Sequence, residues 1–330
     1  MKYRRFGRLG WPVSEIGYGM WGLGDWTGSD DDESRAALRE FVRLGGTFFD
    51  TAWAYGDGHS ERLLGEVLRE HGYAQPTRLA LPLVAASKIP PKNRTWPSKR
   101  GMALEDVFPP EHIREYAERT IENLGTDRVD LLQFHVWEDA WAQDARWQRA
   151  MLALKDEGLV GGIGVSVNRW EPWNVLETLG TGLVDAVQVI YNVFDQAPED
   201  ELFPRCRELG VAVIARVPFD EGTLTGTLTL GSRWPKDDFR HVYFGPENLR
   251  ESVARADALK ALLPAGMTLP ELALRFILGN DDVSTVIPGM RKLRHVRANV
   301  AASDAGPLDR ALQRTLRAHR WDRVPTEWSQ

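Results

Sequence analysis

The 330-residue chain has a single cysteine, Cys206, and this scarcity excludes an internal disulfide framework or a zinc site built on several cysteines. None of its seven histidines belongs to an H-E-x-x-H motif or to another spacing typical of metal ligands. We therefore expect no resident metal ion. The scarcity of cysteine also fits a reducing compartment, so we expect a cytoplasmic protein.

The sequence has neither a strong excess of charge nor a long apolar run. Its 41 Lys and Arg against 47 Asp and Glu give a formal net charge of −6, which argues against binding nucleic acid or an anionic membrane. No uncharged apolar run approaches the roughly 18 residues of a membrane span, and residues 1–19 contain no apolar segment typical of a secretory signal. With no low-complexity block or linker to mark a boundary, we expect one domain over residues 1–330.

Short apolar segments alternate with amphipathic ones along the whole chain. This alternation favours parallel strands joined by helical crossovers, and eight such units predict a (β/α)8 barrel; an open doubly wound sheet is the alternative. Residues 2–11, which are polar and interrupted by glycine, predict a hairpin that closes the barrel floor. The predicted strands are Ser14–Gly19, Thr47–Thr51, Leu79–Lys88, Val129–His135, Val160–Val167, Asp185–Tyr191, Val211–Val217 and Val283–Pro288.

Three helix starts can be placed from local signals. Ser29–Glu33 is rich in acids, which favour a helix N-terminus. Ser60 is a candidate N-cap for the next helix, and apolar spacing predicts a third helix over Pro110–Leu124.

Gly17–Gly22 matches the dinucleotide-binding pattern G-x-G-x-x-G. That pattern needs a helix directly after it, whereas this chain continues with loop-forming residues until about Asp31. We therefore interpret the glycines as places where the backbone approaches a neighbouring strand or a ligand.

In a barrel of this kind, chemistry is expected at the carboxyl ends of the strands. Six predicted strands end in or near polar residues of the types that catalyse reactions or bind ligands. These residues are Asp50, Lys88, His135, Ser166, Gln188 and Arg216.

The segment from Asp50 resembles the signature of the aldo-keto reductase superfamily. It has an Asp, then Tyr55 five residues on, then the Ser60–Glu61 pair and Gly65. Lys88 and His135 match the family's catalytic Lys and His at the ends of the third and fourth strands, and the resemblance extends from Gly19 to about Asn299. It implies that Asp50, Tyr55, Lys88 and His135 are catalytic in the reduction of a carbonyl by hydride transfer.

Elementary chemistry supports the same roles. The oxygen of a carbonyl that accepts a hydride gains negative charge and must be protonated or stabilised. The pKa of a tyrosine is about 10, so a cation such as Lys88 is needed to favour phenolate character, and a buried lysine needs a counter-charge such as Asp50. His135 can bond and orient the substrate oxygen.

The resemblance also implies a nicotinamide cofactor. In the family, Ser166 and Gln188 correspond to residues that bond the carboxamide; many members have Asn directly after the Ser, whereas here Val167 intervenes before Asn168. Arg216 stands where an aromatic ring often stacks on the nicotinamide, and it can stack there or pair with an anion. Gln188 as a plain core amide is the alternative. The full predicted cofactor set is Gly19, Met20, Trp21, Asp50, Ser166, Asn168, Gln188, Arg216, Pro218, Gly222, Leu224, Gly226, Gly289, Met290, Arg291, His295 and Asn299.

The stretch Arg291–Arg297 carries four Arg and Lys side chains and no acid. A 2′-phosphate is stabilised by such charge and a bare ribose is not, so we expect NADP(H) rather than NAD(H). Arg291 is the best candidate for the phosphate contact, and a solvated helix face is the alternative interpretation. His295 stands where many relatives have Arg or Lys, and it carries only part of a charge at neutral pH.

A long insertion follows Lys88, and long loops above a barrel commonly bind substrate. Together with Tyr55 and His135, several loop tryptophans are candidates for an aromatic substrate pocket. They are Trp21, Trp26, Trp53, Trp96 and Trp137.

The sequence thus predicts an NADP-dependent reductase of a small aldehyde, ketone or sugar. The alternative is an NADP-binding regulatory subunit resembling the potassium-channel β-subunits. A metal-dependent barrel enzyme ranks last, and the sequence does not predict the oligomeric state.

Overall fold

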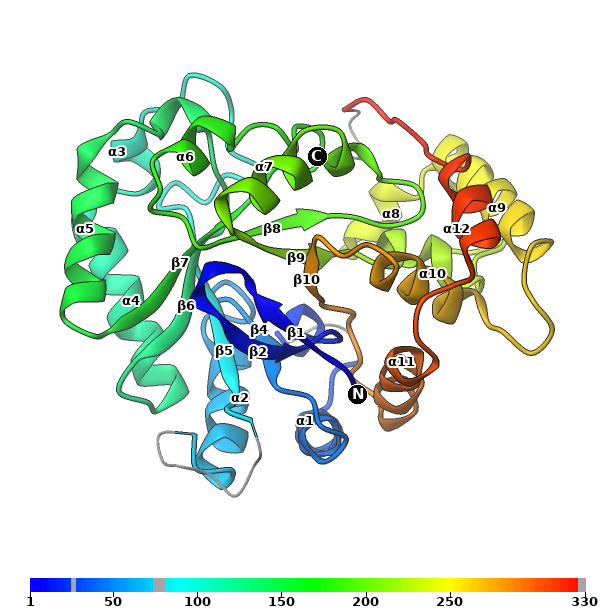
Figure 1. Cartoon of the computed structure of the whole chain (residues 1–330), viewed down its shortest axis with the longest axis horizontal. Helices are drawn as coiled ribbons and strands as arrows, with labels where there is room; N and C mark the ends of the chain where they lie inside the picture. The colour runs from blue at the N-terminus through cyan, green and yellow to red at the C-terminus, as the bar shows by residue number, and fades with distance from the viewer. Residues whose placement is uncertain (25–27, 74–80, 326–330) are drawn as a thin grey trace.

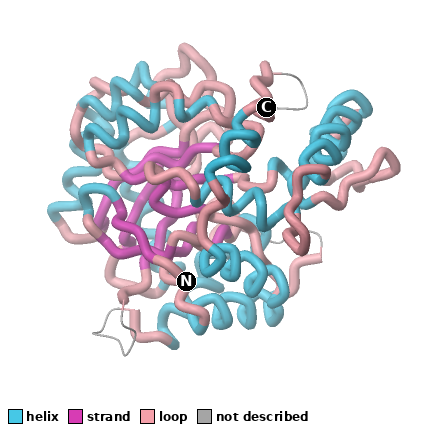
Figure 2. The backbone as a smooth tube through the Cα atoms, turned by 45° about the vertical axis from the view of Figure 1, so that its right-hand side comes forward, coloured by secondary structure: helices cyan, strands magenta, loops and turns pink. Residues whose placement is uncertain are grey.

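A computed structural model describes residues 1–24, 28–73 and 81–325. Eight strands form one parallel sheet in the order β10-β9-β8-β7-β6-β5-β4-β3. Parallel bridges from Ile16 to Val286 and from Gly19 to Gly289 join the two outer strands, so the sheet closes into the predicted barrel. Figure 2 shows the strands at the centre with helices packed around them. The strands are β3 (Tyr18–Gly19), β4 (Phe48–Asp50), β5 (Val84–Ile89), β6 (Val129–Phe134), β7 (Val160–Ser166), β8 (Ala186–Ile190), β9 (Ala212–Arg216) and β10 (Val283–Val286).

The predicted strand order is confirmed, most strand boundaries differ from the prediction by one or two residues, and the starts of two strands differ by more. β3 is only two residues long, because the first predicted residue, Ser14, belongs to the N-terminal hairpin instead. β5 begins at Val84, and residues 79 and 80 of the predicted strand lie outside the described part of the chain.

Helices follow the strands and cover the outside of the barrel (Figure 1). Asp30 caps the first helix by accepting a hydrogen bond from the Glu33 N–H, as the acidic start predicts. The prediction for Ser60 is wrong: the N-cap is Gly58, two residues earlier, and the buried Ser60 hydroxyl bonds Thr51 and the Met20 carbonyl instead. The helices are α1 (Asp31–Arg43), α2 (His59–Glu70), α3 (Leu104–Val107), α4 (Pro110–Leu124), α5 (Ala145–Asp156), α6 (Leu176–Gly180), α7 (Leu202–Leu209), α8 (Phe239–Tyr243), α9 (Pro246–Lys260), α10 (Leu269–Leu278), α11 (Leu293–Ala305) and α12 (Arg310–Arg317).

The antiparallel hairpin β1 (Tyr3–Phe6) and β2 (Trp11–Ser14) lies at the amino ends of the strands. Phe6 and Val13 pack with residues from inside the barrel, and Arg8 bonds Asp185 just before β8. A side chain at Gly7 would place its Cβ 2.6 Å from the main-chain nitrogen of Ala212, so glycine permits this close approach. The hairpin therefore closes the barrel floor and leaves the opposite end for chemistry.

Candidate functional site

The structure brings the four predicted catalytic side chains together at the carboxyl ends of neighbouring strands. Lys88 of β5 lies 2.6 Å from the Asp50 carboxylate at the end of β4 and 3.1 Å from the hydroxyl of Tyr55 in the following loop. The rings of Tyr55 and His135 are nearly perpendicular, with centroids 5.7 Å apart. Each of the four side chains therefore contacts at least one of the others, although they lie in or just after three different strands and within a stretch of 86 residues.

Asp50 and Lys88 form an ion pair that is almost completely shielded from water. Lys88 is 1% exposed and Asp50 is 2% exposed, and the ammonium group also donates to the Thr51 carbonyl at 2.8 Å. The other oxygen of Asp50 accepts hydrogen bonds from the amides of Gln188 at 2.7 Å and Gln133 at 3.1 Å. Each ion therefore has the additional partners that a buried charge needs.

Gln133 is a site residue that sequence reasoning missed. It lies two positions before His135, and residues two apart on a strand point to the same face. This spacing is the signal that could have found it. Gln188, which is predicted to contact the cofactor, also donates a hydrogen bond to Gln133 at 3.2 Å. Gln133 and Gln188 therefore help to hold the Asp50 carboxylate in place.

The local electrostatics fix the protons of the site. Burial raises the pKa of Tyr55 above its usual value, and Lys88 opposes this shift without reversing it. Burial alone would lower the pKa of Lys88, but the interactions with the Asp50 carboxylate and the Tyr55 oxygen outweigh it, so the pKa of Lys88 is raised. Burial, Lys88 and Arg216 lower the pKa of His135 well below its usual value. At neutral pH the site thus contains a protonated phenol, an ammonium ion and a neutral imidazole, and the phenol can donate a proton.

The residues predicted for the carboxamide lie at the ends of β7 and β8. Ser166 is buried and pairs in register with Gln188 across the two strands. The Asn168 amide already has protein partners: it donates to the Trp137 carbonyl and to Glu138, each at 3.3 Å. The extra Val167 explains this, because it moves the asparagine one position past the strand end.

Arg216 ends β9 and faces the catalytic group. It donates to the Val167 carbonyl at 3.1 Å, while its Nε atom is buried with no partner among the described residues. Burial lowers the pKa of this guanidinium. The following loop includes the 3-10 helix η5 (Asp220–Thr225). Gly222 within this helix and Gly226, its C-cap, have positive φ values of 120° and 73°.

The polar side chains of the basic segment after β10 differ in whether their buried nitrogens have protein partners. The Nη1 atom of Arg291 and the amide nitrogen of Asn299 are buried without a partner among the described residues. Arg297 pairs with Glu40 at 2.8 Å, so its charge is already compensated. Burial, Arg294 and Lys292 lower the pKa of His295, which is therefore neutral at neutral pH.

The glycines within Gly17–Gly22 lie where the backbone closely approaches neighbouring segments, which agrees with the interpretation from the sequence. A Cβ on Gly19 would lie 2.5 Å from the Ile287 carbonyl oxygen, and one on Gly22 would lie 3.1 Å from the Arg291 side chain. Gly19 also bridges to Gly289, which joins β3 to the segment after β10. The side chains of Met20, Leu224 and Met290 are buried in the core, so only their main chains are available for a ligand, and Pro218 lies between Val217 and η5.

The predicted tryptophans separate into exposed and buried ones. Trp96 is 41% exposed and its ring is 5.9 Å from His135, and Trp21 is 44% exposed. Trp53 packs on Tyr116 of α4. Trp137 is fully buried among Phe134, Trp141 and Trp147 and donates to Thr178, so the structure places it in the core rather than in a substrate pocket. Trp26 lies outside the described residues.

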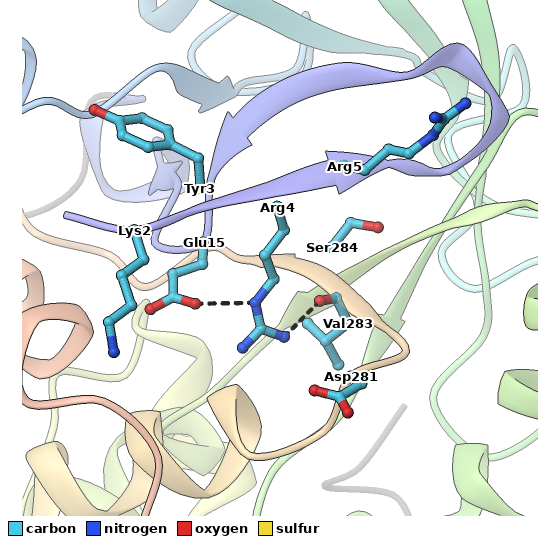
Figure 3. Close-up of a pocket in the computed structure, with 8 residues that line it drawn as sticks. All are labelled: Lys2, Tyr3, Arg4, Arg5, Glu15, Asp281, Val283 and Ser284. Atoms are coloured by element: carbon cyan, nitrogen blue, oxygen red, sulfur yellow. Dashed lines mark hydrogen bonds and ion pairs between the residues drawn. The ribbon is translucent and has the colours of Figure 1, made fainter.

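A pocket of about 420 Å³ lies at the other end of the barrel, between the hairpin and the start of β10 (Figure 3). Its central side chain, Arg4, already bonds Glu15 at 2.9 Å and the Val283 carbonyl at 2.9 Å. Because Arg4 already has protein partners and the catalytic strand ends lie elsewhere, we do not assign this pocket to the reaction.

Two further findings concern the described residues alone. They contain no cluster of three or more His, Cys, Asp or Glu side chains placed to hold a metal ion. Nor does any helix in residues 1–24, 28–73 and 81–325 combine the length and apolar character needed to cross a membrane.

Comparisons with known proteins agree with this arrangement. The chain is 29% identical over 322 residues to an NADH-specific methylglyoxal reductase of Escherichia coli, covering 92% of this chain and 93% of that protein. It is 26% identical over 325 residues to a probable voltage-gated potassium channel subunit beta of Oryza sativa, covering 93% of both. The solved holo structure of an aldo-keto reductase from Bacillus halodurans is 27% identical and superposes with a TM-score of 0.76 over 100% of both chains.

The model of the aldo/keto reductase family matches residues 15–320, which include every catalytic and cofactor position considered above. Together with the barrel closed at its floor and the Asp50–Lys88–Tyr55 contact at its opposite end, this match shows that the chain belongs to the aldo/keto reductase family.

Proposed function

We propose that this protein reduces the carbonyl group of a small aldehyde, ketone or sugar with NADPH, as a single catalytic domain in the cytoplasm. The observation that carries the proposal is the position of Lys88 between Asp50 and Tyr55, with His135 beside the phenol. This arrangement holds a proton donor next to a fixed positive charge that is itself shielded from water.

Unpartnered polar atoms support a cofactor in the predicted place. Arg216, Arg291 and Asn299 each have a buried nitrogen without a partner among the residues that the structure describes, and buried polar atoms are normally bonded. A bound nucleotide offers the phosphate, ribose and carboxamide groups that such nitrogens bind. A reduced nicotinamide supplies the hydride when it is bound.

The remaining steps belong to the side chains of this protein. Tyr55 donates its phenolic proton to the oxygen that gains charge, and the Lys88 ammonium stabilises the phenolate that remains. Asp50 keeps Lys88 charged and in place. The neutral His135 imidazole bonds and orients the substrate oxygen. Trp96 and Trp21 border the entrance, and Ser166 and Gln188 are the proposed carboxamide contacts.

Replacing the Tyr55 phenol tests the central role. Tyr55→Phe removes the proton donor and keeps the ring, so kcat for aldehyde reduction should fall by about 10²–10⁴-fold. NADPH binding, followed by fluorescence titration, should remain within about twofold, because the ring still packs on its neighbours. Unchanged turnover in this variant would refute the assignment of the acid.

The potassium-channel subunit among the relatives makes a regulatory role the second candidate. A regulatory subunit would bind NADPH and need a partner to act. The purified chain should instead oxidise NADPH on its own with a generic aldehyde such as methylglyoxal. Binding of NADPH without turnover across a panel of aldehydes, ketones and sugars would favour the regulatory reading.

A further inference from the structure

The loop after β9 has an unusual backbone. Val217, Asp220 and Glu221 all have positive φ, at 54°, 45° and 54°. Positive φ is unfavourable for side chains other than glycine and most of all for β-branched ones such as valine. Such conformations persist only where the surroundings impose them.

A buried group of charges supplies that constraint. Asp220 has no exposed surface and accepts hydrogen bonds at 2.9 Å from both Arg169, in the loop after β7, and Arg323, near the end of the chain. Glu221 pairs with Arg169 at 3.3 Å. Arg323 also donates a hydrogen bond to Asp195, in the loop after β8, at 2.6 Å.

Arg323 reaches this position because the preceding residues are also tied down. The Trp321 N–H donates to the Phe194 carbonyl at 2.9 Å. The guanidinium groups of Arg255 and Arg323 also form cation–π contacts with the Trp321 ring, at 4.3 Å and 4.4 Å from its centre. In Figure 1 the chain after α12, drawn in red, turns back from the outer helices toward the body of the molecule.

We propose that Arg323 is a positioning residue that holds the loop of residues 217–226 in the conformation that binds the cofactor. The inference rests on the proposed function, in which Pro218, Gly222, Leu224 and Gly226 of this loop contact the cofactor. The C-terminal segment thereby controls how tightly and how long the nucleotide is held.

Charge balance explains why the contact matters. Asp195, Asp220 and Glu221 face two cations, Arg169 and Arg323, in the interior. Without Arg323, three carboxylates share Arg169, and buried charges that lose a partner are strongly destabilised. The loop then leaves the strained conformation, and the apparent affinity falls with the fraction of molecules that remain competent.

The test compares Arg323→Gln with Arg323→Lys and with the matched control Arg320→Gln. Arg320 lies in the same segment but pairs with Asp200 and Asp322 at the surface, so its loss leaves Asp220 untouched. Binding and release of NADPH are measured by fluorescence titration and stopped flow, and the thermal midpoint is measured without cofactor.

We expect Arg323→Gln to raise the NADPH dissociation constant about tenfold through faster release, with Arg323→Lys in between and Arg320→Gln within about twofold of the parent. Should Arg323→Gln fail to fold, Arg323→Lys decides the matter by the same measurements. A lower thermal midpoint with unchanged NADPH affinity and release would make Arg323 merely structural and overturn the proposal. If the unmodified protein binds no nicotinamide nucleotide, it is the proposed function that fails.

Discussion

The two ends of the barrel are built on opposite principles. At the floor, the hairpin packs apolar rings inside the strands, and the buried charges are matched: Arg4 bonds Glu15, and Arg8 bonds Asp185. At the opposite end, His135, Arg216, Arg291 and others keep buried polar atoms without partners in the described chain. The loop after β9 adds positive φ values there. Native proteins normally satisfy their buried polar groups, so the unmet bonding capacity beside the catalytic group marks where a ligand is expected.

The largest effect should come from the floor. Phe6 is fully buried and stacks on Trp11 and Phe48 with ring centroids 5.6 Å and 5.4 Å away. Phe6→Ala should lower the free energy of unfolding by about 3–5 kcal/mol because it leaves a cavity. Urea unfolding measures the loss. Below the unfolding transition kcat should stay within about twofold of the parent, since the catalytic group lies at the other end. A large loss of kcat in folded protein would break the division between the two ends.

A substitution at the opposite end of the barrel should leave stability unchanged and weaken cofactor binding. Arg291→Gln removes a guanidinium whose buried Nη1 atom has no partner among the described residues, so stability without cofactor should stay within about 0.5 kcal/mol of the parent. The dissociation constant for NADPH should rise about tenfold, which corresponds to the loss of one charge-assisted bond of about 1.4 kcal/mol, and that for NADH should change little. Titration with both cofactors measures the contrast.

Equal loss for NADPH and NADH would show that Arg291 does not contact the 2′-phosphate. That outcome would align this protein with its relative from Escherichia coli, which is NADH-specific. Lys292→Gln, at the N-cap of α11, is a neighbouring control for loss of charge alone.

The smallest effect concerns pH. The pKa of His135 is lowered in the folded protein, so the unfolded chain binds a proton more readily. Its contribution to stability is therefore present above the unfolded pKa of about 6.5 and is lost as pH falls below it, by at most about 1.4 kcal/mol per pH unit. His135→Gln should lose less stability between pH 6.5 and 5 than the parent. Chemical denaturation at each pH measures it, and parallel curves for the two proteins would contradict the prediction.

Much of the fold could be predicted from local pattern. The alternation of strands and helices and the helix Pro110–Leu124 appear as predicted, because each depends on residues close in sequence. The N-cap prediction for Ser60 is wrong because a hydroxyl that can cap a helix can equally bond Thr51, and only packing decides between them. For Tyr55, the sequence predicts the direction of the Lys88 effect, and the opposing burial could not be known.

By itself the sequence determined the order of the elements, the family and the group of Asp50, Tyr55, Lys88 and His135, since strand ends and motif spacing are local properties. Only the tertiary structure decided which partners those groups have: Gln133 and Gln188 on Asp50, Glu40 on Arg297, and Arg323 on Asp220. The last pair is separated by 103 positions along the chain. Hydrogen bonds and ion pairs form between groups that the fold brings within a few ångströms of each other. No periodic pattern in the sequence indicates which distant residues these will be, or how strongly burial will shift their pKa values.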